Sequence, residues 1–303
     1  MALTTAQRVE PIQRSLFARL APWVKMTKPR VIELLLVTTV PPMVLAEGGL
    51  PSVPLILAVL VGGALAAGGA NTINSYIERD RDRLMERTQD RPLATGAIAP
   101  LHGLVFGVVL NVIAFAILWP AANLLAACLT LSATLFYVFV YTIWLKPRTD
   151  QNIVIGGAAG AVPVLVGWSA ITNDVAAPAW LLFGVVFLWT PAHFWALAIR
   201  YRDDYARAGT PMLPVARGVR SAANQIVAYS ALTAASSLTL GLTIDVGPLY
   251  VIAASVFGIA IVALALDLRR SPTPQRAIRF FGMSNVYLLA VFAAVAVDVF
   301  VSR

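Results

Sequence analysis

The sequence has very little of the chemistry on which disulfide-bonded, redox and zinc proteins depend. Only one cysteine, Cys128, and two histidines, His102 and His193, occur in its 303 residues. Cys128 lies inside an apolar run, so disulfides and a cysteine-based metal site are excluded. Charged residues are also scarce at 13%, whereas hydrophobic residues reach 59% and the mean hydropathy is +0.77. This balance excludes a soluble domain of this size and predicts a polytopic helical membrane protein.

The first 30 residues lack the long apolar core that a cleaved signal peptide requires. They form a basic arm in which Glu10 is the one acidic residue. We therefore expect a multi-pass protein of the bacterial inner (plasma) membrane, inserted by its own first span. The expected organisation is a cytoplasmic N-terminal arm over residues 1–30 and a nine-helix domain over residues 31–303.

Nine apolar stretches are long enough to cross a bilayer as helices. Every lysine and arginine except the terminal Arg303 lies in the arm or after the second, fourth, sixth or eighth stretch. The connections on the other side carry only the acids Glu47, Asp174 and Asp245. This asymmetry predicts an all-α fold with a cytoplasmic N-terminus and a periplasmic C-terminus. The stretches cover approximately residues 31–47, 54–77, 101–119, 122–145, 152–171, 178–199, 222–244, 247–266 and 280–300.

The basic connections carry no recognition pattern for nucleic acid, so no nucleic-acid partner is expected. The longest connections follow the second and sixth stretches, and they hold most of the polar residues. An active site facing the cytoplasm is therefore the expectation.

The polar residues that follow the second apolar stretch have the spacing of metal ligands on a helix. Asn74, Glu78 and Asp82 recur every four residues, which places their side-chain oxygens on one helix face. Oxygen ligands of this kind suit Mg²⁺. Arginines, which suit phosphate groups, accompany them at positions 79, 83, 87 and 91. The pattern predicts a magnesium-bridged diphosphate held at the membrane surface.

A solvated helix laced with charges is the alternative interpretation, because acids at 78, 82, 86 and 90 alternate with the arginines. Two features favour the metal site. Asn74 lies within the membrane boundary, where polar groups are costly and usually functional. A second acidic pair, Asp203 and Asp204, follows the sixth stretch at an equivalent helix end. Two similarly oriented halves of four helices, with the ninth appended, would face both clusters across one central cavity.

The connection after the fourth stretch offers further groups for an anion. Lys146 and Arg148 are followed by the hydroxyl of Thr149 and the amides of Gln151 and Asn152. Such groups form charge-assisted hydrogen bonds to phosphate. The alternative is that the two cations only anchor the chain on the cytoplasmic side.

His193 lies among aromatic residues near the cytoplasmic end of the sixth stretch. A histidine on an apolar helix is often hydrogen-bonded merely to a neighbour. His193, however, is within about three helical turns of Asp203, so contact with a flat aromatic acceptor substrate is the other interpretation. Tyr201, in the following connection, is a further candidate substrate contact.

Asn74, Glu78 and Asp82 in this spacing resemble the first aspartate-rich motif of the UbiA family of intramembrane prenyltransferases. Further stretches are similar to the members of that family that farnesylate haem, and the resemblance runs from about residue 22 to the end. These stretches cover residues 26–31, 90–93, 141–160, 193–198 and 208–214.

The resemblance implies nine helices around a central, laterally open cavity with a cap on the cytoplasmic side. The implied reaction transfers a farnesyl group from farnesyl diphosphate to a vinyl group of protohaem IX (haem B), adds water and releases diphosphate. The product, haem O, would serve haem A and cytochrome oxidase biogenesis. Mg²⁺ is the implied cofactor, with Mn²⁺ or Ca²⁺ as replacements. The lipid bilayer would supply both apolar substrates, and a haem A synthase is a candidate partner.

The resemblance also implies roles for individual residues. Position 200 is arginine where many relatives have an aspartate of the second site, so the second metal site departs from the family's pattern. Glu78, where many relatives have aspartate in the first site, is a milder change that lengthens the ligand without removing it. The residues implied in metal binding and catalysis are Asn74, Glu78, Asp82, Asp203 and Asp204, and Asp204 is the metal ligand of the second pair. The residues implied in diphosphate binding are Arg79, Arg83, Arg91, Lys146 and Arg148. The residue implied in haem binding is His193.

Two other functions stay open. A prenyltransferase acting on a quinone precursor would use the same diphosphate site, and conversion of haem B or of an aromatic acid separates the two. A polytopic haem or lipid transporter would also need intramembrane polar residues. Transporters place such residues near the midplane, whereas here they gather at the cytoplasmic helix ends.

Overall fold

The computed structural model describes residues 16–244 and 246–302. Half of the predicted N-terminal arm, residues 1–15, lies outside these ranges. The described residues are helical and contain no strand. In chain order the elements are α1 (Leu16–Thr27), α2 (Pro29–Val37), α3 (Val40–Glu47), α4 (Val53–Asp82), α5 (Pro92–Thr95), α6 (Pro100–Ala121), α7 (Leu124–Leu135), the π-helix η1 (Phe136–Leu145), α8 (Asn152–Thr172), α9 (Ala177–Arg200), α10 (Arg202–Arg207), α11 (Leu213–Ala216), α12 (Val219–Thr243), α13 (Pro248–Arg270) and α14 (Pro274–Val301).

Eight of these helices are long and apolar enough to cross a membrane, and they correspond to the second to ninth predicted stretches. They are α4, α6, α7 continued by η1, α8, α9, α12, α13 and α14. The first predicted stretch, residues 31–47, differs. It belongs to a helix pair, Leu20–Thr27 and Ile32–Glu47, that is bent by 52° and counts as a ninth span only if taken together.

The chain between α2 and α3 is broken for a local reason. Pro41 and Pro42 have no backbone N–H, so the carbonyls one turn earlier lose their helical donors. Thr39 N donates to the Leu36 carbonyl at 3.1 Å rather than to Leu35, and the Leu35 carbonyl accepts from the hydroxyls of Thr38 and Thr39 at 2.9 and 2.8 Å. The Thr39 carbonyl lies so close to Gly167 of α8 that a Cβ there would clash with it. The first apolar stretch is therefore held against α8 as two short helices.

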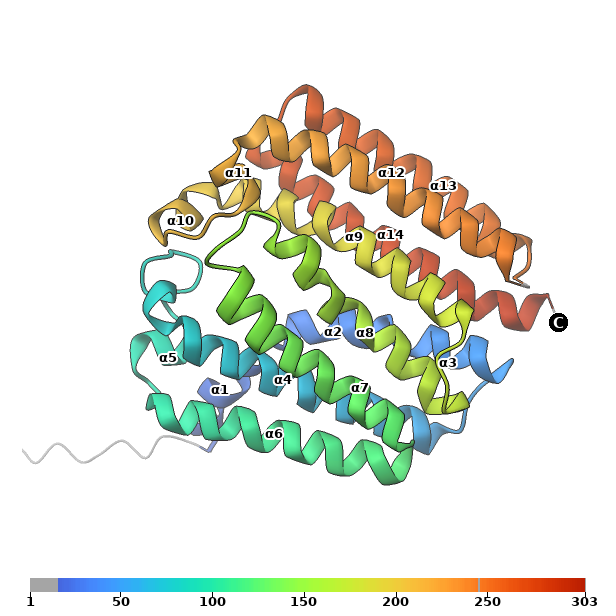
Figure 1. Ribbon diagram of the computed structural model, residues 1–303, viewed down its shortest axis with the longest axis horizontal. Helices are drawn as coiled ribbons and strands as arrows, with labels where there is room; N and C mark the ends of the chain where they lie inside the picture. The colour runs from blue at the N-terminus through green and yellow to red at the C-terminus, as the bar shows by residue number, and fades with distance from the viewer. Residues whose placement is uncertain (1–15, 245, 303) are drawn as a thin grey trace, which may run out of the picture.

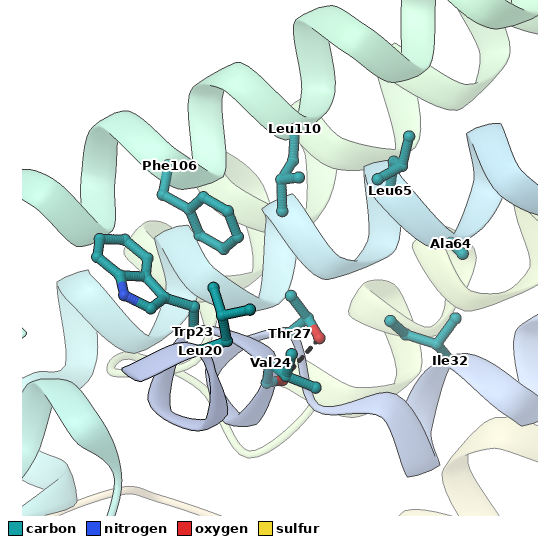
Figure 2. Close-up of a pocket in the computed structure, with 9 residues that line it drawn as sticks. All are labelled: Leu20, Trp23, Val24, Thr27, Ile32, Ala64, Leu65, Phe106 and Leu110. Carbon is teal, nitrogen blue, oxygen red and sulfur yellow. Dashed lines mark hydrogen bonds between the residues drawn. The ribbon is translucent and has the colours of Figure 1, made fainter. Parts of the chain in front are cut away.

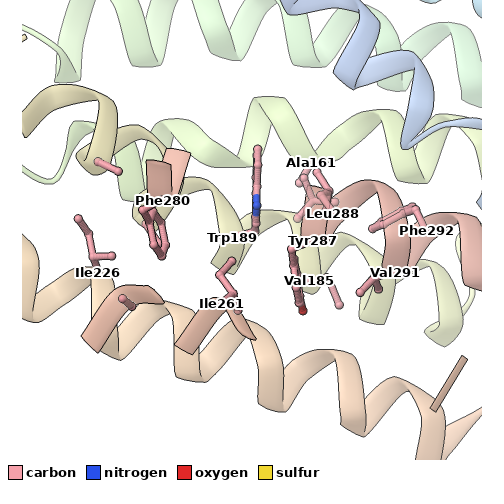
Figure 3. Close-up of a cluster of buried hydrophobic side chains, with 14 of the residues drawn as sticks. Ala161, Val185, Trp189, Ile226, Ile261, Phe280, Tyr287, Leu288, Val291 and Phe292 are labelled. Carbon is pink, nitrogen blue, oxygen red and sulfur yellow. The ribbon is translucent and has the colours of Figure 1, made fainter. Parts of the chain in front are cut away.

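The largest buried apolar cluster forms around α9, with α12, α13 and α14 beside it (Figure 3). Trp189 of α9, Ile226 of α12, Ile261 of α13 and Phe280 of α14 all belong to it. Of the residues in the most apolar 18-residue stretch of α9, 67% are buried, compared with 22% for α6. Apolar side chains on every face of α9 therefore pack inside the bundle, whereas α6 lies at its outer surface.

One end of the bundle collects the polar connections and is called the polar end below. It contains α5, α10, α11 and the connections after α4 and η1, all on the left of Figure 1. The connection after α4 packs against the α10 region, because Met85 shares a buried cluster with Ala198, Tyr205 and Met212. At 1.5 Å per residue, the 30 residues of α4 extend about 45 Å, more than the ~30 Å apolar core of a bilayer. The last turns of α4 therefore reach the polar end.

Candidate functional site

Asn74, Glu78 and Asp82, called the first cluster here, lie on the inward face of the last turns of α4. Their exposed fractions are 2%, 4% and 3%. The helix continues to Asp82, as the four-residue spacing predicted. The opposite face is solvated, and there Arg83 pairs with Asp80 at 3.2 Å. A charge-laced surface helix thus describes the outer face of this segment and is the wrong interpretation for the first cluster.

Each member of the first cluster binds a cation from a different part of the chain. Lys146 donates to Oε2 of Glu78 at 2.6 Å, and Arg91 donates to both oxygens of Asp82 at 2.8 Å. Nζ of Lys28 donates to Oδ1 of Asn74 at 3.0 Å. The tertiary structure therefore gathers three basic side chains around two carboxylates and one amide. Burial and the charge of Arg91 lower the pKa of Lys28 well below its ordinary value of 10.5, and an anion bound beside Lys28 would favour its charged form. A buried group of basic side chains suits a multiply charged anion.

Lys28 is a site residue that the sequence reading did not single out. It stands between α1 and α2 with φ of 55°, in the left-handed region that residues other than glycine rarely adopt. Asn71 holds this turn in place, since its amide donates to the Thr27 carbonyl at 3.1 Å. The only signal in the sequence was the Lys-Pro pair, because proline disfavours a helical conformation in the residue before it.

The first cluster has the donor set of a site for a hard divalent cation. Among the described residues no three carboxylate, histidine or cysteine side chains converge, so the set consists of two carboxylates and an amide. Nδ2 of Asn74 donates to Oε2 of Glu78 at 3.0 Å. The other oxygen, Oε1, lies 2.6 Å from the Lys146 nitrogen, yet it is buried and accepts no hydrogen bond of good geometry. A buried carboxylate oxygen with spare lone pairs fits a metal ligand.

Thr142 of the π-helix η1 and Lys146, the residue just after it, bond side chains of α4. In a π-helix the hydrogen-bonding step is five residues, and Lys146 N accordingly donates to the Tyr141 carbonyl at 2.8 Å. The same step relates Thr142 to Tyr137, and the Thr142 hydroxyl accepts from Nδ2 of Asn74 at 3.2 Å. Tyr141 stacks on Tyr137 with ring centroids 5.4 Å apart. The sequence predicted an ordinary helix here, whose 3.6-residue period would turn Thr142 away from Tyr137, and Lys146 away from Tyr141, to different faces.

Electrostatics keep the ammonium of Lys146 charged. Burial alone would lower the pKa of Lys146, but the Glu78 carboxylate and the hydrogen bond to it outweigh burial and raise this pKa above its ordinary value of 10.5. Its Nζ also lies 5.8 Å from the centre of the Tyr141 ring, within cation–π distance. Lys146 therefore presents a permanent positive charge at neutral pH.

Asp203 and Asp204, the second cluster, open the short helix α10. Asp204 is buried and pairs with Arg207, whereas Asp203 is exposed. Oδ2 of Asp204 also accepts from the backbone N–H of Arg87 at 3.3 Å. The Arg87 side chain donates to the Tyr205 hydroxyl at 3.4 Å and lies over the Tyr201 ring. Arg87, which sequence reading placed only in a row of arginines, thus links the connection after α4 to the second cluster.

Several predicted diphosphate contacts make other bonds in the structure. Arg79 donates to the Tyr76 carbonyl of its own helix, and Arg83 donates to the Ala94 carbonyl of α5. Arg148 donates to the carbonyls of Ile143 and Trp144 at the end of η1. These three arginines thus support the backbone around the site. Their use as direct diphosphate ligands stays a prediction.

The predicted amide contacts lie at the start of α8. Gln151 donates weakly to Asp150 at 3.4 Å. Asn152 is fully buried, and its Nδ2 donates to the Thr149 carbonyl at 2.5 Å while its Oδ1 has no partner among the described residues. Asn152 therefore combines the burial and the free acceptor of a binding group.

His193 faces α14 from the interior of α9. It is 4% exposed, and its Nδ1 lies 2.6 Å from the Ser284 hydroxyl. The interpretation as a histidine bonded to a neighbour is therefore confirmed. Contact with a substrate is compatible with this bond, because the ring has a second nitrogen.

An apolar groove of about 650 Å³ runs between α1, α4 and α6 (Figure 2). Trp23 and Phe106 close one end with their rings in edge contact at 5.0 Å. Thr27 lies at its margin, one residue before Lys28, and donates to the Val24 carbonyl. The groove lining is apolar and suits an alkyl chain rather than a diphosphate.

Comparison with known proteins agrees with this architecture. A protoheme IX farnesyltransferase 1 from Saccharopolyspora erythraea is 52% identical over 282 residues, covering 92% of this chain and 90% of the relative. A protoheme IX farnesyltransferase from Salinispora tropica is 49% identical and covers 94% of this chain and 91% of the relative.

Solved structures share the fold at low identity. A structure of digeranylgeranylglyceryl phosphate synthase superposes with a TM-score of 0.75 at 16% identity, covering 93% of this chain and 98% of that one. A UbiA homologue from Archaeoglobus fulgidus bound to DMAPP and Mg²⁺ reaches 0.65 at 19% identity, covering 91% and 99%. The pattern of the UbiA prenyltransferase family matches residues 35–292. The chain belongs to the UbiA prenyltransferase family.

Proposed function

We propose that this protein is a haem O synthase, which transfers a farnesyl group from farnesyl diphosphate to a vinyl group of haem B. One observation carries the proposal: a buried cluster of oxygen ligands, each bonded to a basic side chain, lies at the end of an apolar helix. The choice of haem as acceptor is supported by relatives about 50% identical that are named protoheme IX farnesyltransferase.

The cofactor of the reaction would be Mg²⁺, replaceable by Mn²⁺ or Ca²⁺. Asn74, Glu78 and Asp82 would hold it, and Asp204 would hold a second ion beside the exposed Asp203. When bound, the ion withdraws charge from the diphosphate leaving group. The unpartnered Oε1 of Glu78 supports this assignment, as does the Mg²⁺ bound to a UbiA homologue of the same fold.

The cations of the site would stabilise the leaving group. When a metal occupies Asn74, Asp82 and Glu78, the diphosphate would replace these side chains as the partner of Lys28, Arg91 and Lys146. Negative charge grows on the diphosphate as the allylic C–O bond breaks, and preorganised cations lower the energy of that state. Arg79, Arg83, Arg148, Gln151 and Tyr201 would support the site from its border.

The aromatic side of the site would protect the farnesyl group. Tyr137 and Tyr141 form a stacked pair beside Lys146. A ring face stabilises the positive charge that develops on the allylic carbons, and burial excludes water until the haem vinyl group has attacked. The allylic C–O bond would break with release of diphosphate, and a bond would form between the allylic carbon and the haem vinyl group. Water would then add as hydroxyl to the cation left on the vinyl side, with loss of a proton.

The proposed topology has nine spans around a central cavity in the bacterial inner membrane. The N-terminus and the polar end would face the cytoplasm and the C-terminus the periplasm, because the basic residues flank the polar end. A haem A synthase, which would consume the product, is the proposed partner. Cysteines introduced after removal of Cys128 test the topology: position 203 should react with an impermeant thiol reagent only in inside-out vesicles.

Product analysis tests the proposed reaction. Purified protein incubated with haem B, farnesyl diphosphate and Mg²⁺ should form a pigment whose mass is that of haem B plus a farnesyl group and water. Omission of the divalent ion should abolish it. Prenylation of an aromatic acid in place of haem B would instead establish the quinone-precursor enzyme, and haem movement without diphosphate release would establish a transporter.

A further inference from the structure

The His193 ring is enclosed on both faces by aromatic rings. Trp189 stacks on one face with centroids 4.1 Å apart and an interplanar angle of 22°. Phe281 of α14 stacks on the other at 4.2 Å and 27°. A porphyrin therefore has no free face of this imidazole to stack on. Only an edge of the ring can reach a ligand.

The edge that carries Nδ1 is already used by Ser284, which is fully buried on α14. The Ser284 hydroxyl is 2.6 Å from Nδ1 and 2.7 Å from the Phe281 carbonyl. A carbonyl can only accept, so the hydroxyl proton of Ser284 is assigned to Phe281. With this assignment Nδ1 carries the proton that it donates to Ser284. This tautomer leaves the lone pair of the imidazole on Nε2.

Nε2 of His193 has no hydrogen-bond partner among the described residues, yet it is not sealed in the protein. The fully buried side-chain polar atoms without a partner belong to Glu78, Asn152, Trp168, Trp195, Ser230 and Asn285. Nε2 of His193 is not one of these fully buried atoms, so part of its surface is accessible. A neutral imidazole with one N–H anchored and the other nitrogen free is the usual arrangement of a metal-binding histidine.

Ser284 also fixes the neighbouring ring. Its backbone carbonyl accepts from Nε1 of Trp189 at 2.8 Å. One residue of α14 thus orients His193 through its side chain and Trp189 through its main chain, and Phe281 completes the stack from the preceding turn. Such a doubly held ring loses little further freedom when it binds a ligand.

We propose that Ser284 is a positioning residue that holds His193 with Nε2 free to bind the iron of the acceptor haem. The iron here belongs to the substrate. The bond forms when Nε2 donates its lone pair to the iron, without transfer of an electron or a proton. Iron ligation would fix the porphyrin at one side of the bundle and so determine which edge of it meets the farnesyl group. This inference rests on the proposed haem O synthase activity.

Absorption spectra of the purified protein with ferric haem B, without farnesyl diphosphate, test the inference. Wild-type protein should shift the Soret band as an imidazole-ligated haem does. Ser284→Ala should lose that shift and raise the haem Kd by 10- to 100-fold, the range for loss of a group that orients a metal ligand. Metal-free protoporphyrin IX should bind both proteins within about twofold, because it has no iron. The KM for farnesyl diphosphate should not change.

Two further variants separate positioning from folding. Ser284→Thr keeps the hydroxyl and should restore the spectrum. Ser237→Ala is the matched control, since Ser237 is also fully buried and also bonds α12 to α14, through the Tyr287 hydroxyl at 2.5 Å. It should retain the wild-type spectrum.

The outcomes are distinct. A Ser284→Ala protein with the wild-type Soret band, or one that loses haem and protoporphyrin equally, would show that Ser284 only joins α9 to α14, and the inference would be overturned. Failure of the wild-type protein to bind any haem B would overturn the proposed function as well.

Discussion

The two clusters at the polar end of the bundle are built differently although both follow apolar helices. The first cluster, Asn74, Glu78 and Asp82, lies within α4, and its members bond basic side chains that are 46, 68 and 9 residues away in the chain, respectively. In the second cluster Asp204 pairs with Arg207 of its own helix, and Asp203 is exposed. Burial with long-range partners characterises the first cluster, and local pairing characterises the second.

This difference teaches which cluster can do the harder chemistry. Buried charges interact strongly because water does not screen them, whereas an exposed pair contributes little. The first cluster is therefore the expected centre of the reaction. The second cluster bonds the connection after α4, because Asp204 accepts from the backbone N–H of Arg87. The predictions below test this ranking.

The largest effect is expected for Asp82→Asn. The change keeps the shape of the side chain but removes a metal ligand and the partner of Arg91. The rate of farnesyl transfer should fall by at least about 100-fold, the usual cost of one electrostatic contact to a transition state. Single-turnover rates at saturating Mg²⁺ measure this. A rate within threefold of wild type would remove Asp82 from the site, and Asp203→Asn is the exposed control.

The pair Lys146 and Glu78 should show strong coupling. Lys146→Gln leaves the Glu78 carboxylate buried without its cation, which costs about 3–5 kcal/mol of stability. The double variant with Glu78→Gln should recover most of that stability but none of the activity, since both groups serve the substrates. Thermal unfolding in detergent gives the first quantity and product formation the second. Stability losses that simply add would contradict a direct pair.

Asp204→Asn should have an intermediate effect. It weakens the bonds to Arg207 and to the Arg87 backbone, so the connection after α4 should become looser. We expect about a tenfold drop in kcat/KM for farnesyl diphosphate, and about twofold for Asp203→Asn. Equal losses in the two variants would mean that exposure does not distinguish these acids. Limited proteolysis near residue 87 should report the loosening.

Thr142→Val should have a smaller effect. It removes the hydroxyl that accepts from Asn74 while keeping the side-chain shape. A single neutral hydrogen bond is worth about 1 kcal/mol, so Mg²⁺ should bind about fivefold more weakly. Thr130→Val is the matched control, because Thr130 is also buried but bonds only within α7. An unchanged Mg²⁺ requirement in Thr142→Val would show that Asn74 needs no support from η1.

The smallest effect concerns pH. The folded pKa of Lys146 lies above its ordinary value of 10.5, so the stability from its pair with Glu78 is fully present below that value. It should be lost only as the pH rises through the folded pKa. The difference in melting temperature between wild type and Lys146→Gln should therefore stay constant from pH 6 to pH 9, and a decline within that range would contradict the assignment.

Periodicity and charge predicted much of the fold. Eight of the nine apolar stretches are helices of membrane-crossing length, and the spacing of Asn74, Glu78 and Asp82 places them on one face. The first stretch differs from a single straight helix, because a break between α2 and α3 divides it. Prediction did not find the π-helix η1, because hydrophobicity does not distinguish a five-residue hydrogen-bonding step from a four-residue step.

The sequence by itself determined that this is a helical membrane protein whose polar residues gather at helix ends, because hydrophobic length and charge are local properties of the chain. Only the tertiary structure decided which cation meets which oxygen. Lys28, Arg91 and Lys146 come from three separate segments, and packing alone brings them to α4. The same holds for His193, since its free nitrogen depends on a serine 91 residues away in the chain.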